Sequence, residues 1–217
     1  MNCIFLLSPA QTGGKRAELV LNPQAQFPLA RKLHGGQGVA LGELFSFLSG
    51  LYFRGKLAYA QGFARPPAGI PGALVITSNR GLVDPDNLIT LKDLIAFSQV
   101  PVDCNEPRYR RPMERHARRL ADHCADCKFV LLGSVGTRKY ASVLLPALGE
   151  RLLFPKEFVG RGDMSRGGLL LRSIRAGREL EYTPLAGAVV HGPRPPKLER
   201  LPRPTANLIS NTSRHGW

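Results

Sequence analysis

Long apolar runs, cysteine and acidic residues are all scarce in this 217-residue sequence. No apolar run approaches the roughly 20 residues that a membrane-spanning helix needs, so we expect no association with a membrane. Residues 1–9 lack the positively charged start of a secretory signal and instead predict a buried strand. We therefore expect a cytoplasmic protein, in which thiols stay reduced.

The sequence contains four cysteines, at positions 3, 104, 124 and 127. Cys124 and Cys127 form a Cys-Ala-Asp-Cys motif beside His123. A structural zinc site usually needs a second pair of ligands at a comparable short spacing, and the remaining cysteines do not supply one. We predict that this motif is not a metal site, and we expect no cofactor.

Acidic residues are outnumbered, because 16 Asp and Glu face 30 Lys and Arg and leave a formal net charge of +14. A field of this sign attracts polyanions, so it favours nucleic acid or an anionic nucleotide-like ligand as the partner. A basic surface that serves only solubility is the alternative. Hydrophobic residues make up 43% of the chain, which is typical of a soluble globular protein.

Short apolar runs alternate with longer amphipathic ones along the chain. Strands are predicted at residues 3–7, 73–77, 129–132, 152–154 and 180–184, and their continuous apolar content suits strands covered on both faces. Helices are predicted at 41–64, 91–99, 112–123, 139–148 and 165–176, the first of them with breaks at Gly50 and Gly55 and the second capped by Thr90 with Asp93. This alternation predicts a single α/β domain with a mostly parallel sheet flanked by helices.

The end of the chain has a different composition. Residues 188–217 are rich in proline and arginine and show no hydrophobic period, so we predict an α/β domain over 1–187 followed by an extended basic tail. The tail is either a basic arm that lies along a nucleic acid or a solvated terminus.

Ligands of open α/β sheets bind beyond the carboxyl ends of the strands, and here that rule selects four loops. Each loop combines small hydroxyl or glycine residues with a cation, and together they predict a polar, positively charged pocket. The first three loops contribute Ser8 and Thr12, then Ser78 and Arg80, then Ser134, Lys139 and Tyr140.

The fourth loop, residues 159–168, has the strongest signal for a ligand site. Glycines such as Gly162 let backbone amides approach a ligand, and the first turn of a helix favours an anion. Arg161 and Arg166 add planar donors suited to phosphate or carboxylate. The alternative is a loop capped by Asp163 or Ser165 whose arginines face water.

The predicted helix 112–123 has one strongly basic face. Apolar residues recur at helical spacing toward the core, and Arg111, Arg115 and Arg118 fall on the opposite side. This face is either simply solvated or contacts the phosphate backbone of a nucleic acid.

Several of these segments resemble the YaaA-like proteins, bacterial proteins associated with peroxide stress. Residues 8–12, Ser-Pro-Ala-Gln-Thr, are similar to that family's Ser-Pro-Ala-Lys-Thr, with Gln11 in place of its lysine. Residues 134–140 resemble its small-residue loop before a tyrosine-bearing helix, and residues 161–166 resemble its Arg-Gly-x-Met-Ser-Arg segment. Residues 77–84 are similar to a loop of related families with a uracil-DNA-glycosylase-like core. The resemblance spans residues 1–185 and implies an α/β fold and a DNA-associated role, but no established catalytic residue.

Two functions therefore follow as hypotheses. The first is a nucleic-acid or nucleotide-binding protein that holds phosphate at residues 161–168. The second is an enzyme acting on a nucleoside, nucleotide or damaged base, as an N-glycosidase does, with Asp163 or Asp84 positioning a water. In that case Ser8, Ser134 and Arg166 hold the base or phosphate. A scaffold protein without a small ligand is a third possibility.

Overall fold

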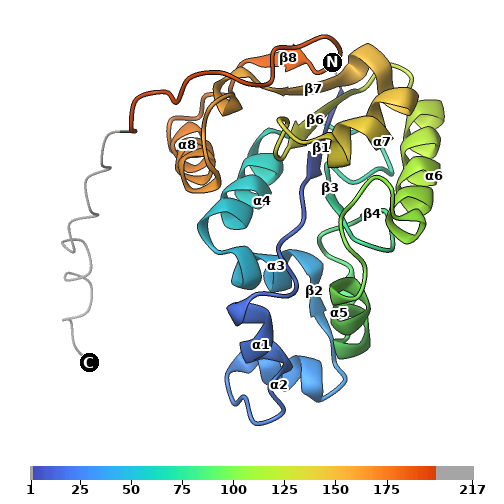
Figure 1. Ribbon diagram of the computed structural model, residues 1–217, viewed down its shortest axis with the longest axis vertical. Coiled ribbons are helices and arrows are strands. Elements are labelled where there is room, and N and C mark those ends of the chain that lie inside the picture. Colours follow the sequence, from blue (N-terminus) through green and yellow to red (C-terminus); the bar gives the residue numbers. More distant parts are fainter. Residues whose placement is uncertain (1, 199–217) are drawn as a thin grey trace, which may run out of the picture.

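The computed structural model describes residues 2–198. A six-stranded sheet forms the centre of this structure (Figure 1). Its strands lie in the order β4-β3-β1-β6-β7-β8. The four inner strands are parallel: β3 (Ala73–Ile76), β1 (Cys3–Leu7), β6 (Lys128–Leu132) and β7 (Leu152–Pro155). Antiparallel strands form both edges, β4 (Leu82–Val83) and β8 (Tyr182–Pro184). The fold is thus the predicted α/β domain with a mostly parallel sheet.

Helices cover both faces of the sheet, which is why its inner strands are apolar throughout. Along β1, Phe5 and Leu7 pack toward α4 (Leu51–Phe63) and α8 (Asp163–Arg175), whereas Ile4 and Leu6 pack toward α6 (Pro107–His123) and α7 (Arg138–Leu148). Figure 1 shows these two pairs of helices on opposite sides of the sheet.

The remaining elements gather beyond the carboxyl end of β1 (Figure 1). They are α1 (Lys15–Leu21), α2 (Pro28–His34), α3 (Leu41–Ser49), α5 (Leu91–Ser98) and a small sheet of β2 (Val39–Ala40) with β5 (Leu88–Ile89). Two short 3-10 turns, Gly149–Arg151 and Lys156–Phe158, precede and follow β7.

Two of the helix predictions need correction. The helix at 41–64 is broken at Gly50, whose φ is +62°, but it continues through Gly55. The helix expected from residue 112 begins at Pro107, since Pro107 also suits the first helical position and Glu106 caps it. Pro112 is therefore tolerated inside a 17-residue helix. Thr90 and Asp93 form the predicted capping box at the start of α5.

The Cys-Ala-Asp-Cys motif forms the turn between α6 and β6. Cys124 and Cys127 are both buried in the apolar layer on that face of the sheet, and Arg151 donates to the carbonyl oxygens of Cys124 and Ala125. Within residues 2–198, no group of three His, Cys, Asp or Glu side chains is placed to hold a metal ion.

Residues 188–198 contain no helix or strand, and the rest of the expected tail, 199–217, lies outside the described residues. The described part lies against the domain, with Ala188 and Val190 packed on the apolar layer beside α6 and α7. None of the helices within the described range is long and apolar enough to cross a membrane.

Candidate functional site

A cavity of about 650 Å³ opens at the carboxyl edge of the sheet. Its walls come from the loops after β1 and β6, the junction of α3 and α4, the segment after α5 and the first residue of α8. The sequence-predicted residues that line it are Ser8, Thr12, Ser134, Lys139, Tyr140 and Asp163. Three of the four selected loops thus meet at one place.

The pairing of β1 with β6 explains why the first and third loops meet. Leu7 is opposite Leu132 in the parallel register, and the backbone N–H of Ser8 donates to the Leu132 carbonyl oxygen at 3.1 Å. Gly133 follows directly, and a Cβ added there would lie 2.9 Å from the Ser8 Cβ. A glycine is therefore needed beside Ser8, because any side chain would displace it.

Ser8 is held from beneath by a lysine that the sequence analysis missed. The Lys56 side chain, from α4, is 0% exposed, and its Nζ lies 2.7 Å from the Ser8 Oγ and also contacts the Ser8 carbonyl oxygen. A signal was present, since Tyr52, Lys56 and Tyr59 recur at helical spacing on the buried face of α4. A lysine at a core position of that pattern is unusual.

Burial lowers the pKa of Lys56 to about 7, because the charged ammonium loses its water. The carboxylate of Asp163 acts against this shift, whereas the positive charges of Arg166 and Lys139 add to it. The Nζ also lies 4.5 Å from the centre of the Tyr52 ring. Near neutral pH this lysine is therefore divided between its charged and neutral forms.

Two buried tyrosines complete the surroundings of Ser8. Tyr52 and Tyr140 both line the cavity, and burial raises the pKa of each, so both stay protonated at neutral pH. Hydrogen bonding to Ser8 opposes that shift at Tyr140. Among the described residues, the Tyr52 hydroxyl has no hydrogen-bond partner at normal geometry, although the Arg166 guanidinium is near enough to lower the pKa of Tyr52. It is a polar group left for a ligand.

Two glycines bring α4 and α8 together at this site. A Cβ added at Gly55 would lie 2.9 Å from the Gly167 carbonyl oxygen, and one added at Gly167 would lie 2.9 Å from the Tyr52 Cα. Gly167 therefore permits close packing of the two helices. The sequence had instead led us to expect that the glycines of this segment let a ligand approach the backbone. This packing sets the start of α8 beside the face of α4 that carries Lys56.

The rest of the glycine-rich segment does not line the cavity within the described structure. Arg166 is 8% exposed, donates to the Phe158 carbonyl oxygen and lies 3.5 Å from the Asp163 carboxylate. Arg161 donates to the Ser165 hydroxyl and to the Pro196 carbonyl oxygen. Gly162 is the N-cap of α8. Of this segment, Asp163 is the residue that lines the cavity, and its side chain makes no capping hydrogen bond to the residues described.

The loop after β3 also points elsewhere. The Ser78 hydroxyl donates to the Phe97 carbonyl oxygen, and Arg80 pairs with Asp93. The Asp84 carboxylate accepts from the N–H of Asp86, two residues on. The reason is the antiparallel hairpin to β4, which turns this loop along the sheet edge instead of across the strand ends. The expected ligand roles of Ser78, Arg80 and Asp84 have no support from their positions.

The arginines of α6 lie on a separate surface. Arg111, Arg115 and Arg118 are exposed and line a shallow depression that also includes Glu114. Glu114 is paired with Arg110 at 2.6 Å, and the three predicted arginines have no ion pair within residues 2–198. This face of α6 therefore keeps its positive charge available to a partner.

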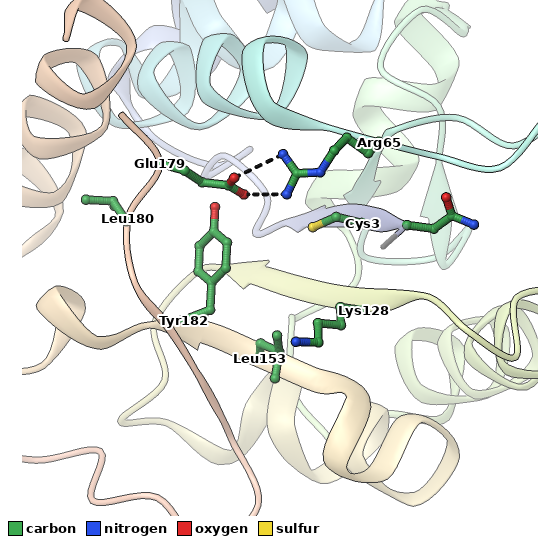
Figure 2. Close-up of a pocket in the computed structure, with 8 residues that line it drawn as sticks. Cys3, Arg65, Lys128, Leu153, Glu179, Leu180 and Tyr182 are labelled. Carbon is green, nitrogen blue, oxygen red and sulfur yellow. Dashed lines mark hydrogen bonds and ion pairs between the residues drawn. The ribbon is translucent and has the colours of Figure 1, made fainter. Parts of the chain in front are cut away.

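A second cavity, of about 240 Å³, lies at the opposite, amino edge of the sheet (Figure 2). Figure 2 shows the Arg65 guanidinium facing the Glu179 carboxylate. The two groups form a bidentate ion pair, with N–O distances of 3.0 and 3.1 Å. Burial raises the pKa of the nearby Cys3 thiol to about 11, which disfavours the reactive thiolate. Since Arg65 and Glu179 satisfy each other and the thiol is inert, the larger cavity is the better candidate.

No protein family, no curated protein and no solved structure matches the chain, so the likeness to YaaA-like proteins depends on the short motifs alone.

Proposed function

We propose that the chain binds an anionic, nucleotide-like ligand in the cavity at the carboxyl edge of the sheet. The observation that carries this proposal is the convergence of Ser8, Ser134, Lys139 and Asp163 on one cavity from three separate segments of the chain. Its volume of about 650 Å³ falls within the usual range for small-molecule sites.

The lining of the cavity combines apolar and polar groups, which suits such a ligand. Leu48, Tyr52, Val100 and Val102 supply apolar surface against which a flat ring can lie. Thr12, Ser134, Lys139 and other polar groups supply hydrogen bonds and charge. A ligand with an aromatic base and a phosphate or carboxylate uses both kinds of group at once.

The anionic end of the ligand belongs near Lys139. This residue lies in the first turn of α7, where backbone N–H groups are free and the helix dipole favours negative charge. Asp163 adds an acceptor on the cavity wall and repels a ligand that is negatively charged throughout. The expected ligand therefore has donor groups, such as ring N–H or sugar hydroxyls, as well as an anion.

The test is a binding experiment on the full chain with a mixture of nucleotides and nucleosides, followed by mass spectrometry of what is retained. Lys139→Met should weaken binding of the retained compound about 10-fold to 100-fold, as expected for loss of one charge-assisted hydrogen bond. The matched control is Lys32→Met, an exposed lysine on α2. Equal affinity in both variants would contradict the proposed position of the anion.

A second function, binding of nucleic acid, is favoured by the exposed arginine face of α6. We expect little sequence preference and an affinity that falls steeply with salt, because phosphate contacts release counterions. Replacing Arg111, Arg115 and Arg118 together by alanine should reduce the slope of log affinity against log salt by up to about 3. An unchanged slope would remove α6 from the interface and leave the cavity proposal intact.

A further inference from the structure

Ser8 and Lys56 have the complementary positions expected of a nucleophile and its base. Ser8 lines the cavity and is 5% exposed, whereas Lys56 lies beneath it and is 0% exposed. Their Oγ and Nζ atoms are 2.7 Å apart. We propose that Ser8 is a nucleophile activated by Lys56, and that the cavity hydrolyses a carboxylic ester or amide of its anionic ligand. This inference rests on the proposed function for the identity of the ligand, but not for the reactivity of the serine.

The hydrogen bonds around Lys56 suit a neutral amine. With two N–H groups and one lone pair, the amine donates to the Ser8 carbonyl oxygen and can accept the proton of the Ser8 hydroxyl. Within the described chain no carboxylate lies in ion-pair range of its Nζ. A lysine with a purely structural role would normally be paired when it is fully buried.

The charged, polar and aromatic groups around Lys56 come from α4, α7, α8 and the residue after β1. Asp163 and Arg166 on α8 act in opposite directions on its charge, and Lys139 on α7 disfavours it. The Tyr52 and Phe53 rings on its own helix lie 4.5 and 4.9 Å from the Nζ. Ser8, directly after β1, contributes its hydroxyl and carbonyl oxygens. Burial outweighs the attraction to Asp163, so the neutral form is available near pH 7.

The chemical step then follows a balanced course. The Ser8 Oγ attacks the carbonyl carbon, a C–O bond forms, and the hydroxyl proton passes to the Lys56 Nζ. When the tetrahedral intermediate collapses, the bond to the alcohol or amine breaks and the same proton passes to that leaving group. Water from the cavity then attacks the acyl-serine and gives a proton to the Lys56 Nζ. As the bond between the acyl carbon and Ser8 Oγ breaks, this proton passes to Oγ, which restores Ser8 and neutral Lys56 and releases the carboxylic acid.

The cavity also contains hydrogen-bond donors for the oxyanion. The Tyr52 hydroxyl is buried, stays protonated and has no hydrogen bond of normal geometry within the described residues. Ser134 lines the same cavity, directly after Gly133. Acyl transfer needs donors of this kind to stabilise the developing oxyanion.

The experiment uses a fluorophosphonate on the full chain, with peptide mass mapping of the modified residue between pH 5 and 9. In this reaction the Ser8 Oγ–P bond forms, the P–F bond breaks, fluoride leaves and the proton goes to Lys56. We expect labelling of Ser8 with a rate that rises with pH and has its midpoint near 7. Ser8→Ala should abolish labelling, and Lys56→Met should slow it about 100-fold or more.

The matched controls are Ser142→Ala, a half-buried serine on α7 that donates to the Arg138 carbonyl oxygen of its own helix, and Lys32→Met, and both should label normally. Unlabelled Ser8 in wild-type protein that still retains nucleotide would overturn this inference and leave the proposed function standing. Labelling of Ser8 in protein that retains no nucleotide would contradict the proposed function and leave the reactivity of Ser8 standing. If Lys56→Met does not fold, the wild-type profile decides, since a rate independent of pH would eliminate Lys56 as the base.

Discussion

The packing of α4 on α8 can be tested by adding one methyl group at Gly167. A Cβ there would lie 2.9 Å from the Tyr52 Cα and 3.0 Å from the Leu51 carbonyl oxygen. Both atoms belong to the backbone, and ordinary Cβ contacts begin at 3.4 Å, so the helices must separate by about half an ångström. Overpacking of this kind costs about 1–3 kcal/mol, against about 1 kcal/mol gained by placing alanine instead of glycine in a helix. We expect Gly167→Ala to lower the free energy of unfolding by about 1 kcal/mol, the difference between the two terms.

The matched control is Gly168→Ala, one residue further along the same helix. Its Cβ would meet the end of the flexible Arg172 side chain at 3.1 Å, and no backbone atom as closely. Here the gain in helix propensity should dominate, so the two variants should differ by about 2 kcal/mol, the cost of overpacking alone. Urea unfolding measures this as a midpoint difference of roughly 1 M for a slope near 2 kcal/mol/M. Equal midpoints for the two variants would refute the claim that Gly167 is required for close helix packing.

Three further predictions concern the site and its support. The pKa of Lys56 falls from 10.5 to about 7 on folding, so between these pH values the unfolded state binds more protons than the folded state. The free energy of unfolding of wild type, relative to that of Lys56→Met, should therefore rise with pH across this window, by up to about 1.4 kcal/mol per pH unit in urea unfolding. Gly133→Ala, whose Cβ would press on Ser8, should reduce fluorophosphonate labelling while circular dichroism shows an intact fold; normal labelling would contradict the close fit. Arg151→Met should lower the unfolding free energy by about 1–3 kcal/mol, because it removes donors to three carbonyl oxygens at the end of α6, and an unchanged thermal midpoint would contradict this.

Much of the fold could be predicted because a parallel strand that is buried on both faces has a continuous apolar sequence. The runs at 3–7, 73–77, 129–132 and 152–154 are continuous and apolar, and each forms an inner strand. The helices at residues 15–34 were missed because they are short, with seven residues each, and are separated by a turn that contains Pro23. Their stability comes from packing beyond the end of β1, which no local pattern records.

The site was predicted less completely, for a different reason. Strand ends select loops, and this was enough to find Ser8, Ser134 and Lys139. Whether an arginine of such a loop faces a ligand or a backbone carbonyl depends on tertiary contacts, and Arg166 turns to Phe158. The sequence likewise does not distinguish a glycine that a ligand approaches from one that a second helix approaches. Lys56 was missed because strand-end reasoning leaves out helix interiors.

The two edge strands have a consequence for self-association. Parallel inner strands such as β6, with the sequence Lys-Phe-Val-Leu-Leu, would be strong templates for intermolecular pairing if their edges were open. Within the described chain they are covered by β4, of only two residues, and β8, which ends at Pro184 and so presents no N–H there. Such brief edges offer an incoming strand too few hydrogen bonds to extend the sheet. Loss of β8 would instead expose Leu152–Pro155, making that margin the place where aggregation should start.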